Sequence, residues 1–527
     1  MITGKNYIGT TLSAKGTTTY TTFNPQRNKE NTTVFTEATP EEINQAVEAA
    51  SEAFKTYRTV SGSEKATFLN AIADEILALE DELITIYTAE SGLPEGRALG
   101  ERGRTIAQLR MFANVVGEGS WVEATIDPAQ PNREPNPRAD IRKMLVPIGP
   151  VVVFGASNFP LAFSTAGGDT VSALASGCPV IVKSHPMHAG TSELVATAII
   201  KAVKKTSMPN GVFSHLNSRG IEVGQQLVQH PKVKAVGFTG SLRGGRALLD
   251  IAANRKEPIP VFTEMGSINP VILLPKATQE KAEIWAKTYA SSITLGAGQF
   301  CTNPGLVIGI KSEGLFKFSA TLVSEIVKIA PQCMLHPKIQ ENYQKLVSQA
   351  KTQKHVEIVA DLHTNVDENY AQQTIAKVSG KEFIANKTLQ EEVFGPFSLL
   401  VECENKEELE NVLACMNGQL TGTILSEQNE LDDFSTVVDI LSEKVGRIIH
   451  NGVPTGVEVT TAMQHGGPYP ASSDSRFTAV GTDAIKRWVR PFAYQDWPNE
   501  SLPDALKNEN PLQIFRKVDL INTKEAL

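Results

Sequence analysis

The chain has 527 residues, more than one compact core usually holds, so two or three domains are expected. Hydrophobic residues make up 41% and charged residues 20%, which indicates a globular protein and not a disordered chain. The formal net charge of −8 provides no general attraction for nucleic acid or anionic lipid, so neither is expected as a partner.

The five cysteines are an odd number without Cys-x-x-Cys spacing, so the sequence indicates neither a disulfide framework nor a metal site. The N-terminus lacks the basic segment and apolar core of a signal peptide. The longest apolar run, around residues 146–156, is too short to span a bilayer. We therefore expect a cytoplasmic protein that binds no metal.

The first part of the chain is predicted to be helical. Residues 40–117 carry apolar side chains at three- and four-residue spacing, beginning at Pro40 with Ile43 and Val47 on one face. The pattern continues over residues 64–90. A proline-rich stretch at 127–138 then breaks the regularity, as in a connecting arm or loop.

Short β-branched runs alternate with helix-compatible stretches from residue 146 onward, which is typical of parallel α/β sheets. The runs fall into two groups, so two α/β lobes are the simplest architecture. The polar tail from residue 495 is expected either to wrap a neighbouring subunit or to be partly mobile. The predicted strands lie at residues 150–154, 178–183, 233–238, 258–263, 269–274, 305–310, 397–402 and 446–450.

Cys301 follows a short Gly-Ala-Gly stretch. Glycine lets backbone N–H groups approach a bound oxygen closely, which suits the position of a nucleophile. Taken alone, a free cysteine is more often a small, buried and inert hydrophobe, and the other four cysteines keep that interpretation.

Two polar residues follow apolar strands, at the edge where an α/β sheet places its active site. Glu264 ends the strand predicted at 258–263, and Asn158 follows the strand predicted at 150–154. The carboxylate can serve as a base, and the amide can donate to a developing oxyanion. Taken alone, Glu264 would be interpreted as a solvated surface residue.

Together, these segments resemble the aldehyde dehydrogenase superfamily over nearly the whole chain and in the family's order. Any one short motif is weak evidence, but the ordered set argues strongly against chance. The motifs are Asn158-Phe-Pro, Val182-Lys183, Phe238-Thr-Gly-Ser241, Glu264-Met-Gly, Gly298-Gln-Phe-Cys301, Glu391-Glu-Val-Phe-Gly-Pro396 and Asn451-Gly-Val-Pro.

The resemblance implies an α/β fold with two Rossmann-like lobes and a small β oligomerisation arm. Since the family usually forms dimers or tetramers through this arm, we expect a homodimer or homotetramer. The expected domains are a cofactor-binding domain at 1–120 and 148–262, a catalytic domain at 263–462, and the arm with its C-terminal return segment at 121–147 and 463–527.

The resemblance also implies a reaction on a small-molecule aldehyde. The thiolate of Cys301 attacks the aldehyde carbon, and the amide of Asn158 with the Cys301 N–H stabilises the oxyanion. Hydride then passes from the thiohemiacetal to the nicotinamide and leaves a thioester. Glu264 acts as the general base on the water that hydrolyses this thioester.

No Gly-x-Gly-x-x-Gly sequence follows the first strand, so a standard Rossmann phosphate loop is not expected. In the family the pyrophosphate lies near the helix opened by the motif that contains Gly240 and Ser241. An ordinary strand-to-helix turn is the alternative for this segment. The resemblance assigns Lys183 to the adenosine ribose, and Glu392 and Phe394 to the nicotinamide ribose and ring.

Pro186 stands where NAD-preferring members often carry a glutamate that binds the ribose hydroxyls. Without that carboxylate a 2′-phosphate meets no repulsion, and Lys183, Ser184 and His185 can donate to it. NADP is therefore the expected cofactor, with NAD as the alternative. Capping or packing is the alternative role of His185.

Arg104 lies on a predicted helix that contributes to the substrate tunnel in this family. A buried arginine there would bind a carboxylate at the far end of the aldehyde. The alternative is a surface arginine on an amphipathic helix, and Arg102 and Arg110 are interpreted as structural. Phe159, next to Asn158, is also expected to contact the substrate.

Several segments look like the α-ketoglutaric semialdehyde (2,5-dioxopentanoate) dehydrogenase branch. We therefore expect oxidation of 2,5-dioxopentanoate to 2-oxoglutarate, with succinic semialdehyde or another short carboxylated aldehyde as the alternative. These segments begin at Phe154, Lys183, Thr191, Gln299 and Gln464.

Three other interpretations stay open. A dehydrogenase that passes the acyl group to coenzyme A generally lacks the glutamate present here as Glu264. A cofactor-free cysteine esterase would need a histidine to activate Cys301, and no histidine lies in a recognisable dyad motif. Against a catalytically silent protein stand the retained Cys301, Glu264 and Asn158.

Overall fold

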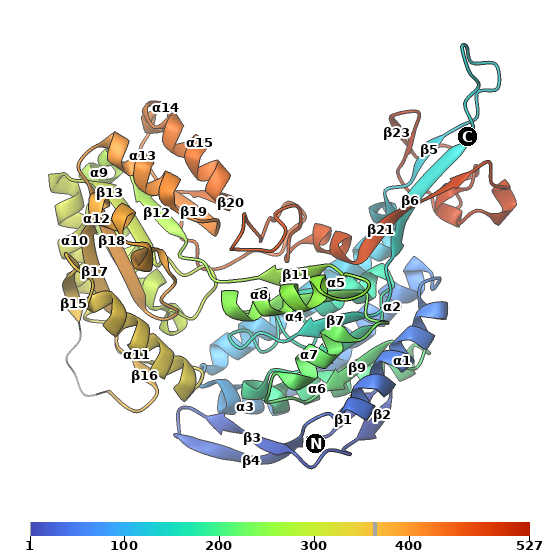
Figure 1. Cartoon of the computed structure of the whole chain (residues 1–527), viewed down its shortest axis with the longest axis horizontal. Coiled ribbons are helices and arrows are strands. Elements are labelled where there is room, and N and C mark those ends of the chain that lie inside the picture. The colour runs from blue at the N-terminus through green and yellow to red at the C-terminus, as the bar shows by residue number, and fades with distance from the viewer. Residues whose placement is uncertain (1, 362–365) are drawn as a thin grey trace.

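Two α/β lobes and a separate arm sheet make up the computed structural model, which describes residues 2–361 and 366–527 (Figure 1). Each lobe contains a seven-stranded sheet, and the arm contains a five-stranded one. In Figure 1 the second lobe lies at the left and the arm projects at the upper right. This arrangement confirms the predicted fold class of two α/β lobes with a small β arm.

The first sheet is parallel across five strands and is extended at one edge by antiparallel N-terminal strands. In order across the sheet, its strands are β11 (Val261–Glu264), β10 (Ala235–Thr239), β7 (Val151–Phe154), β8 (Val180–Lys183), β9 (Phe213–Leu216), β1 (Asn6–Ile8) and β2 (Thr11–Ser13).

Helices cover both faces of this sheet. Alternate residues of each strand point to opposite faces, and apolar side chains on both faces are buried against these helices. Val151 and Val153 belong to one core, whereas Val152 and Phe154 belong to another. The first core includes residues of α2 (Gly62–Leu77), α3 (Glu80–Ser91), α4 (Glu95–Glu118), α5 (Gly168–Ser176) and α6 (Ala189–Lys205), and the second includes residues of α1 (Pro40–Tyr57), α7 (Glu222–Gln229) and α8 (Leu242–Ala253).

The helical pattern predicted over residues 40–117 corresponds to the four helices α1 to α4. Helix α1 begins with a capping box, in which Thr39 and Glu42 satisfy each other's backbone N–H groups. The pattern over residues 64–90 is interrupted at Glu80, where φ is 43° and the chain turns from α2 into α3. That stretch therefore forms two helices.

The second sheet is parallel except for its edge strand β15, and helices also cover both of its faces. In order, its strands are β15 (Glu357–Asp361), β17 (Thr374–Ser379), β18 (Phe397–Cys403), β13 (Leu306–Ile310), β12 (Pro270–Leu273), β19 (Gln419–Leu425) and β20 (Val445–His450). One face packs on α9 (Pro275–Thr294) and α10 (Glu313–Ile326), and the other on α11 (Pro337–Lys351), α12 (Gly380–Ala385), α13 (Lys406–Cys415) and α15 (Ser435–Lys444).

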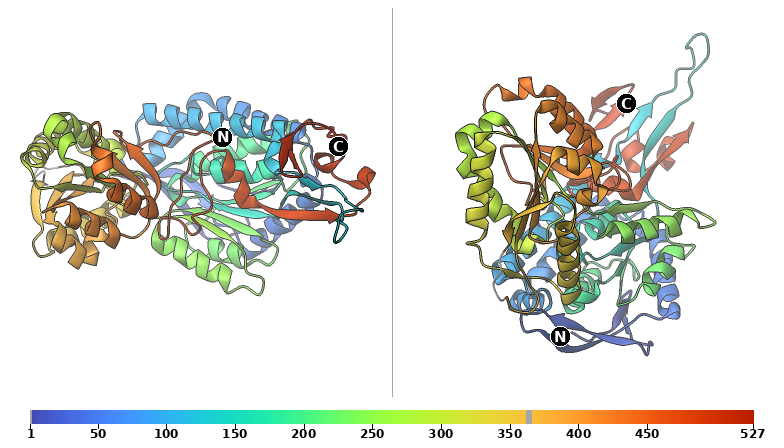
Figure 2. Two further views of the ribbon diagram at one scale, coloured as in Figure 1. Left: turned by 90° about the horizontal axis from the view of Figure 1, so that it is seen from above. Right: turned by 60° about the vertical axis from the view of Figure 1, so that its left-hand side comes forward.

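The arm sheet combines two distant parts of the chain and projects away from both lobes (Figure 2). The tail after residue 495 contributes its last two strands, and the role of the arm in assembly stays a prediction. In order, the strands are β21 (Val489–Gln495), β6 (Ile141–Pro147), β5 (Thr125–Asp127), β22 (Arg516–Val518) and β23 (Ile521–Thr523).

The carboxyl ends of the first sheet's strands face the second lobe, and the chain passes from β11 into β12 between the lobes (Figure 1). The loop after β20 returns across the same region, where the N–H of Met265 donates to the oxygen of Ala471. Residues from three distant segments thus meet at one place. None of the described helices is long and apolar enough to cross a membrane.

Candidate active site

Cys301 follows a short left-handed turn, η3 (Leu295–Gly298), that ends helix α9. Gly296, Ala297 and Gly298 have φ values of 57°, 55° and 65°, in the left-handed region that the two glycines adopt at little cost. A side chain at Gly298 would also collide with the backbone oxygen of Gly395. The Gly-Ala-Gly stretch therefore presents Cys301 through a backbone path that larger residues would disrupt.

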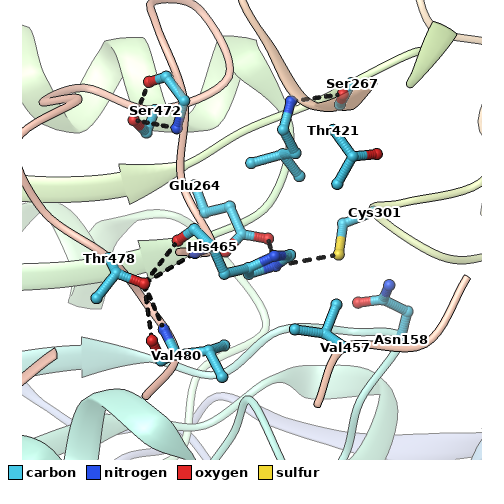
Figure 3. Close-up of polar contacts among 12 residues, drawn as sticks. Asn158, Glu264, Ser267, Cys301, Thr421, Val457, His465, Ser472, Thr478 and Val480 are labelled. Carbon is cyan, nitrogen blue, oxygen red and sulfur yellow. Dashed lines mark hydrogen bonds and ion pairs between the residues drawn. The ribbon is translucent and has the colours of Figure 1, made fainter. Parts of the chain in front are cut away.

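The thiol of Cys301 lies beside a buried histidine and a buried glutamate (Figure 3). Nε2 of His465 is 3.6 Å from Sγ of Cys301 and 3.0 Å from Oε1 of Glu264. No histidine lies in a recognisable dyad motif of the sequence, yet the fold places His465 in contact with Cys301. No local pattern indicates this contact, because His465 is 164 residues from the cysteine and reaches it through the returning loop.

The environment of Cys301 opposes formation of a thiolate. Burial, followed by the negative charge of Glu264, holds the pKa of the thiol well above its usual range. Oε2 of Glu264 is buried, and none of the described residues supplies it with a hydrogen-bond donor. That oxygen can therefore accept a proton from the thiol or from a water.

Asn158 reaches the cysteine loop from the segment after β7. Its Nδ2 donates to the backbone oxygen of Gln299, 3.1 Å away and two residues before the cysteine. Figure 3 shows the amide and the thiol on the same side of the site. The amide is thus held against the loop that carries Cys301, and its role as a donor to an oxyanion stays a prediction.

A cavity of about 230 Å³ opens onto Cys301. Aromatic rings form one wall, where Phe159 lies 5.3 Å from Phe163 and 5.6 Å from Phe300 between ring centroids. Helix α4 forms another wall through Gly96, Gly100 and Arg104, four residues apart on one face. The cavity therefore brings together Cys301 and both predicted substrate-binding residues.

Arg104 lies in this cavity with part of its guanidinium uncommitted. Nη1 donates to the backbone oxygen of Val457, whereas Nε and Nη2 are buried and lack a partner among the described residues. Nε and Nη2 form one edge of the guanidinium, the edge that pairs with a carboxylate through two parallel hydrogen bonds. Arg104 is thus not a surface residue of an amphipathic helix.

The sequence analysis missed Arg97, which lines the same cavity two helical turns before Arg104. Its guanidinium lies 4.4 Å from the ring of Phe159 and 4.6 Å from that of Phe300. Glu101 is 3.6 Å away as its ion-pair partner. The spacing of seven residues between Arg97 and Arg104 places both on one face of a helix, and this was the signal in the sequence that could have identified Arg97.

The other two arginines considered on α4 point away from the cavity. Arg102 donates to the backbone oxygen of Glu80, and Arg110 pairs with Asp74 at 3.5 Å on the surface. Both agree with a structural role.

The segment after β8 holds the residues expected at the adenosine ribose. Burial lowers the pKa of Lys183 to about 8. Ser184 is fully buried, and its hydroxyl donates to Asn217 at 3.3 Å. Its side chain is therefore committed to the protein interior, and its contact with a cofactor stays a prediction.

His185 caps the turn that follows it, because its Nδ1 accepts a hydrogen bond from the N–H of Met187. Burial and the nearby His188 and Lys183 hold the pKa of His185 well below its usual range, so the ring is neutral. With Nδ1 as an acceptor, the proton lies on Nε2, and that atom is the one able to donate to a phosphate.

Gly240 and Ser241 lie at the exposed N-terminus of α8. The hydroxyl oxygen of Ser241 accepts from the N–H of Gly244 and caps the helix. Side chains at Gly240 or Gly244 would crowd the ring of Phe238. The open backbone and the positive helix end suit an anionic group such as a pyrophosphate.

Glu392 and Phe394 line a small cavity together with Phe300. Oε1 of Glu392 accepts from the N–H of Ser267 at 3.3 Å. Burial raises the pKa of Glu392 to about 7. This carboxyl can therefore be neutral or charged near neutral pH.

Comparison with known proteins gives one consistent result. Residues 12–488 match the aldehyde dehydrogenase family. The chain is 46% identical over 519 residues to alpha-ketoglutaric semialdehyde dehydrogenase 2 of Azospirillum brasilense, covering 98% of this chain and 99% of the relative. It is 42% identical over 522 residues to alpha-ketoglutaric semialdehyde dehydrogenase of Acinetobacter baylyi, covering 99% of each.

Solved structures agree on the fold. A structure of betaine aldehyde dehydrogenase from Staphylococcus aureus in complex with NAD+ superposes with a TM-score of 0.81 at 19% identity, over 94% of this chain and 96% of that one. A 1-pyrroline-5-carboxylate dehydrogenase gives a TM-score of 0.78 at 21% identity, over 93% and 92%. With the match along most of its length and a half-buried cysteine beside a buried glutamate, the chain belongs to the aldehyde dehydrogenase family.

Proposed function

We propose that the protein oxidises α-ketoglutaric semialdehyde (2,5-dioxopentanoate) to 2-oxoglutarate, with NADP as the preferred cofactor and NAD as the alternative. The observation that carries the substrate is the free edge of Arg104 in the cavity that also contains Cys301. A carboxylate at one end of the substrate would pair with that edge. The names of the two full-length relatives support the same substrate.

The residues along the cofactor side fit a dinucleotide. The N-terminus of α8 offers free backbone donors to a pyrophosphate, and Lys183 offers a cation near the end of β8. Glu392 and Phe394 lie beside the reacting cysteine's loop. When bound, the oxidised nicotinamide would accept hydride from the substrate carbon.

The chain's own residues account for the remaining steps. Sγ of Cys301 attacks the aldehyde carbon, and Asn158 with the Cys301 N–H donates to the oxyanion. Oxidation leaves a thioester on Sγ. Glu264 then takes a proton from a water, which attacks the thioester and releases the acid.

The preference for NADP rests on the segment after β8. Pro186 supplies no carboxylate to bind ribose hydroxyls or repel a 2′-phosphate. Lys183 supplies positive charge there, and Nε2 of His185 supplies a neutral donor. A 2′-phosphate would gain charge-assisted hydrogen bonds that NAD lacks.

Steady-state kinetics test this function with 2,5-dioxopentanoate, succinic semialdehyde and an uncharged aldehyde, each with NAD and NADP. Arg104→Ala should lower kcat/KM for the carboxylated aldehydes by about 100-fold, as expected for a lost charged hydrogen-bonding partner, and change the uncharged one little. Arg110→Ala, on the surface of the same helix, is the matched control. Equal selectivity in Arg104→Ala and wild type would refute the substrate assignment.

A second candidate activity is ester hydrolysis without nucleotide, because Nε2 of His465 lies 3.6 Å from Sγ of Cys301. This activity requires the tautomer with the imidazole proton on Nδ1, so that Nε2 can accept the thiol proton. Hydrolysis of an activated ester should then proceed in nucleotide-free enzyme, survive Glu264→Ala and be lost in His465→Phe. Loss in both variants would assign the hydrolysis to the dehydrogenase machinery instead.

We propose a homodimer or homotetramer that assembles through the arm sheet, which exposes large apolar side chains such as Phe492 and Ile521. The five cysteines are free thiols, which supports a reducing compartment such as the cytoplasm. Light scattering of the full chain tests the assembly, and a monomer at all concentrations would exclude it.

A further inference from the structure

We infer that the Nε2–H of His465 is shared between Glu264 and Cys301 and stabilises the Cys301 thiolate once the thiol proton has moved to Glu264. The inference rests on the reaction class of the proposed function, in which Cys301 is the nucleophile. It depends neither on the identity of the aldehyde nor on the choice between NAD and NADP.

The hydrogen-bond partners of His465 identify its tautomer. Oε1 of Glu264 lies 3.0 Å from Nε2, and an ionised carboxylate only accepts hydrogen bonds. Nδ1 is buried without a partner in the described part of the chain. A proton on Nε2 satisfies the carboxylate, whereas a proton on Nδ1 would leave a buried donor unpaired and two lone pairs facing each other. The resting imidazole therefore carries its proton on Nε2.

This tautomer makes His465 a donor to the thiolate and not a base for the thiol. Its Nε2–H already points into the space between the two acidic groups, with Sγ of Cys301 at 3.6 Å. The proton acceptor must then be Glu264, whose Oε2 is unpaired within the described structure. Three titratable groups thus share one donor and one mobile proton.

The proton transfer is balanced and moves no net charge into the site. The Sγ–H bond of Cys301 breaks, the electron pair stays on sulfur, and the proton bonds to a carboxylate oxygen of Glu264. Neutral Glu264 is a weaker acceptor, so the Nε2–H of His465 shifts its hydrogen bond to the thiolate. Because the negative charge only moves from carboxylate to sulfur, the buried site avoids the cost of holding a second charge.

Such a donor is needed because the other charges around Cys301 stabilise its thiolate only in part. Burial and the carboxylates raise the pKa of the thiol, and Arg104 lowers it by a smaller effect. A hydrogen-bond donor in direct contact with Sγ stabilises the thiolate and not the thiol. It therefore offsets part of the increase in the pKa of Cys301. In the described structure, the charged or titratable groups around Cys301 include Glu264, Glu392, His465, Arg104 and Arg447, and Arg97 and Glu101 line the same cavity.

The surrounding structure holds the imidazole in this position. The backbone N–H of His465 donates to the hydroxyl of Thr478 at 2.9 Å, and the ring of Phe163 lies 6.1 Å from the imidazole. The side chain of His465 is only 1% exposed. The ring therefore meets Cys301 and Glu264 without competition from bulk water.

The test measures the rate at which iodoacetamide alkylates Cys301 as a function of pH, in nucleotide-free protein without aldehyde. EDTA is included, because the ligand atoms of Glu264, Cys301 and His465 lie within 4.8 Å of one another and could chelate a metal ion. Mass spectrometry identifies the labelled cysteine, and Cys301→Ser gives the background from the other thiols.

Two substitutions separate a donor from a base. His465→Phe removes both functions, whereas His465→Gln places an amide N–H near the position of Nε2 but cannot accept a proton. We expect His465→Phe to slow alkylation at neutral pH at least tenfold and to move the profile toward higher pH. His465→Gln should retain most of the wild-type profile. His450→Gln, a surface histidine bonded to Ser426, is the matched control.

An unchanged profile in His465→Phe would overturn the inference, and so would a His465→Gln profile as slow as that of His465→Phe, since the histidine would then act as a base. Circular dichroism and Tm verify that each variant is folded. Because no aldehyde or nucleotide is present, this result stands apart from the kinetic test: a protein with the expected alkylation profile but no activity on 2,5-dioxopentanoate would refute only the proposed substrate.

Discussion

The amide of Asn158 donates to the backbone oxygen of Gln299 across 3.1 Å, and so links the loop after β7 to the loop that carries Cys301. If Asn158 is the oxyanion donor, as proposed, its amide is oriented before any substrate arrives. This contact joins two segments that are 141 residues apart in the sequence.

Asn158→Ala should lower kcat by about 100- to 1000-fold, the usual effect of removing one oxyanion donor, with a smaller change in KM. Alkylation of Cys301 should stay close to the wild-type rate, because the thiol itself is unaltered. Steady-state kinetics and the alkylation assay check these two outcomes. A kcat within threefold of the wild-type value would show that Asn158 is not an oxyanion donor in the reaction.

Gly100 on α4 leaves space in the cavity but lowers the stability of the helix. A Cβ at Gly100 or at Gly103 would meet no atom within 4 Å, but only Gly100 lines the cavity. Either substitution to Ala should therefore stabilise the protein by about 0.5–1 kcal/mol, as expected for a glycine inside a helix.

Larger side chains should separate the two positions. Gly100→Leu should reduce kcat/KM at least tenfold by filling the cavity, whereas Gly103→Leu should leave it unchanged. Thermal unfolding and kinetics on the same preparations provide the comparison. Equal activity in both leucine variants would show that the substrate does not approach this face of α4.

Local sequence patterns predicted the strands with continuous apolar runs. Strands β7 and β8 are buried on both faces, so they read as continuous valine and isoleucine runs. Strands β9 and β19 were missed because they contain buried polar residues. Their polar groups are satisfied only in the fold, where Ser214 accepts from Gly9 and Thr421 donates to Asn269.

The same limit applies to the candidate site. Cys301, Glu264 and Asn158 were identified because each stands in one of the ordered family motifs; taken alone, Cys301 and Glu264 would have been interpreted as structural or surface residues. His465 stands in the segment that begins at Gln464, and Arg97 has helical spacing from Arg104, but neither pattern shows which residues lie opposite these side chains after folding. The inward orientation of Ser184 depends on Asn217 at the end of β9, the strand that the sequence did not indicate.

Glu392→Gln should change how stability depends on pH. The pKa of about 7 in the folded protein exceeds the usual value of 4.5, so the folded state binds a proton more tightly than the unfolded state. This contribution to stability is complete below about pH 4.5 and is lost as the pH rises through 7.

Relative to wild type, Glu392→Gln should therefore become more stable as the pH rises from about 5 to 8, by at most about 3 kcal/mol. Denaturant or thermal unfolding of both proteins at several pH values measures the difference. A constant difference across this range would mean that the carboxyl is solvated and titrates normally.

Lys183 should give the use of NADP an alkaline limit. Because burial lowers the pKa of this ammonium to about 8, the free enzyme loses its positive charge at Lys183 as the pH rises above that value. A 2′-phosphate would lose a charged partner, whereas the uncharged ribose hydroxyl of NAD would lose much less. The KM for NADP should therefore rise above pH 8 while the KM for NAD rises less.

Lys183→Arg should flatten this rise, since a guanidinium keeps its charge throughout the range. Lys201→Arg, at an exposed position on α6, is the matched control and should keep the wild-type dependence. The measurement is the KM for each nucleotide at saturating aldehyde from about pH 7 to 9.5. The assignment to Lys183 would fail if the KM values for NADP and NAD rose in parallel, or if the KM of Lys183→Arg for NADP rose as in wild type. A cation that loses its charge should weaken binding of a 2′-phosphate more than binding of a hydroxyl. In either case the selectivity for NADP would have to come from a group other than Lys183.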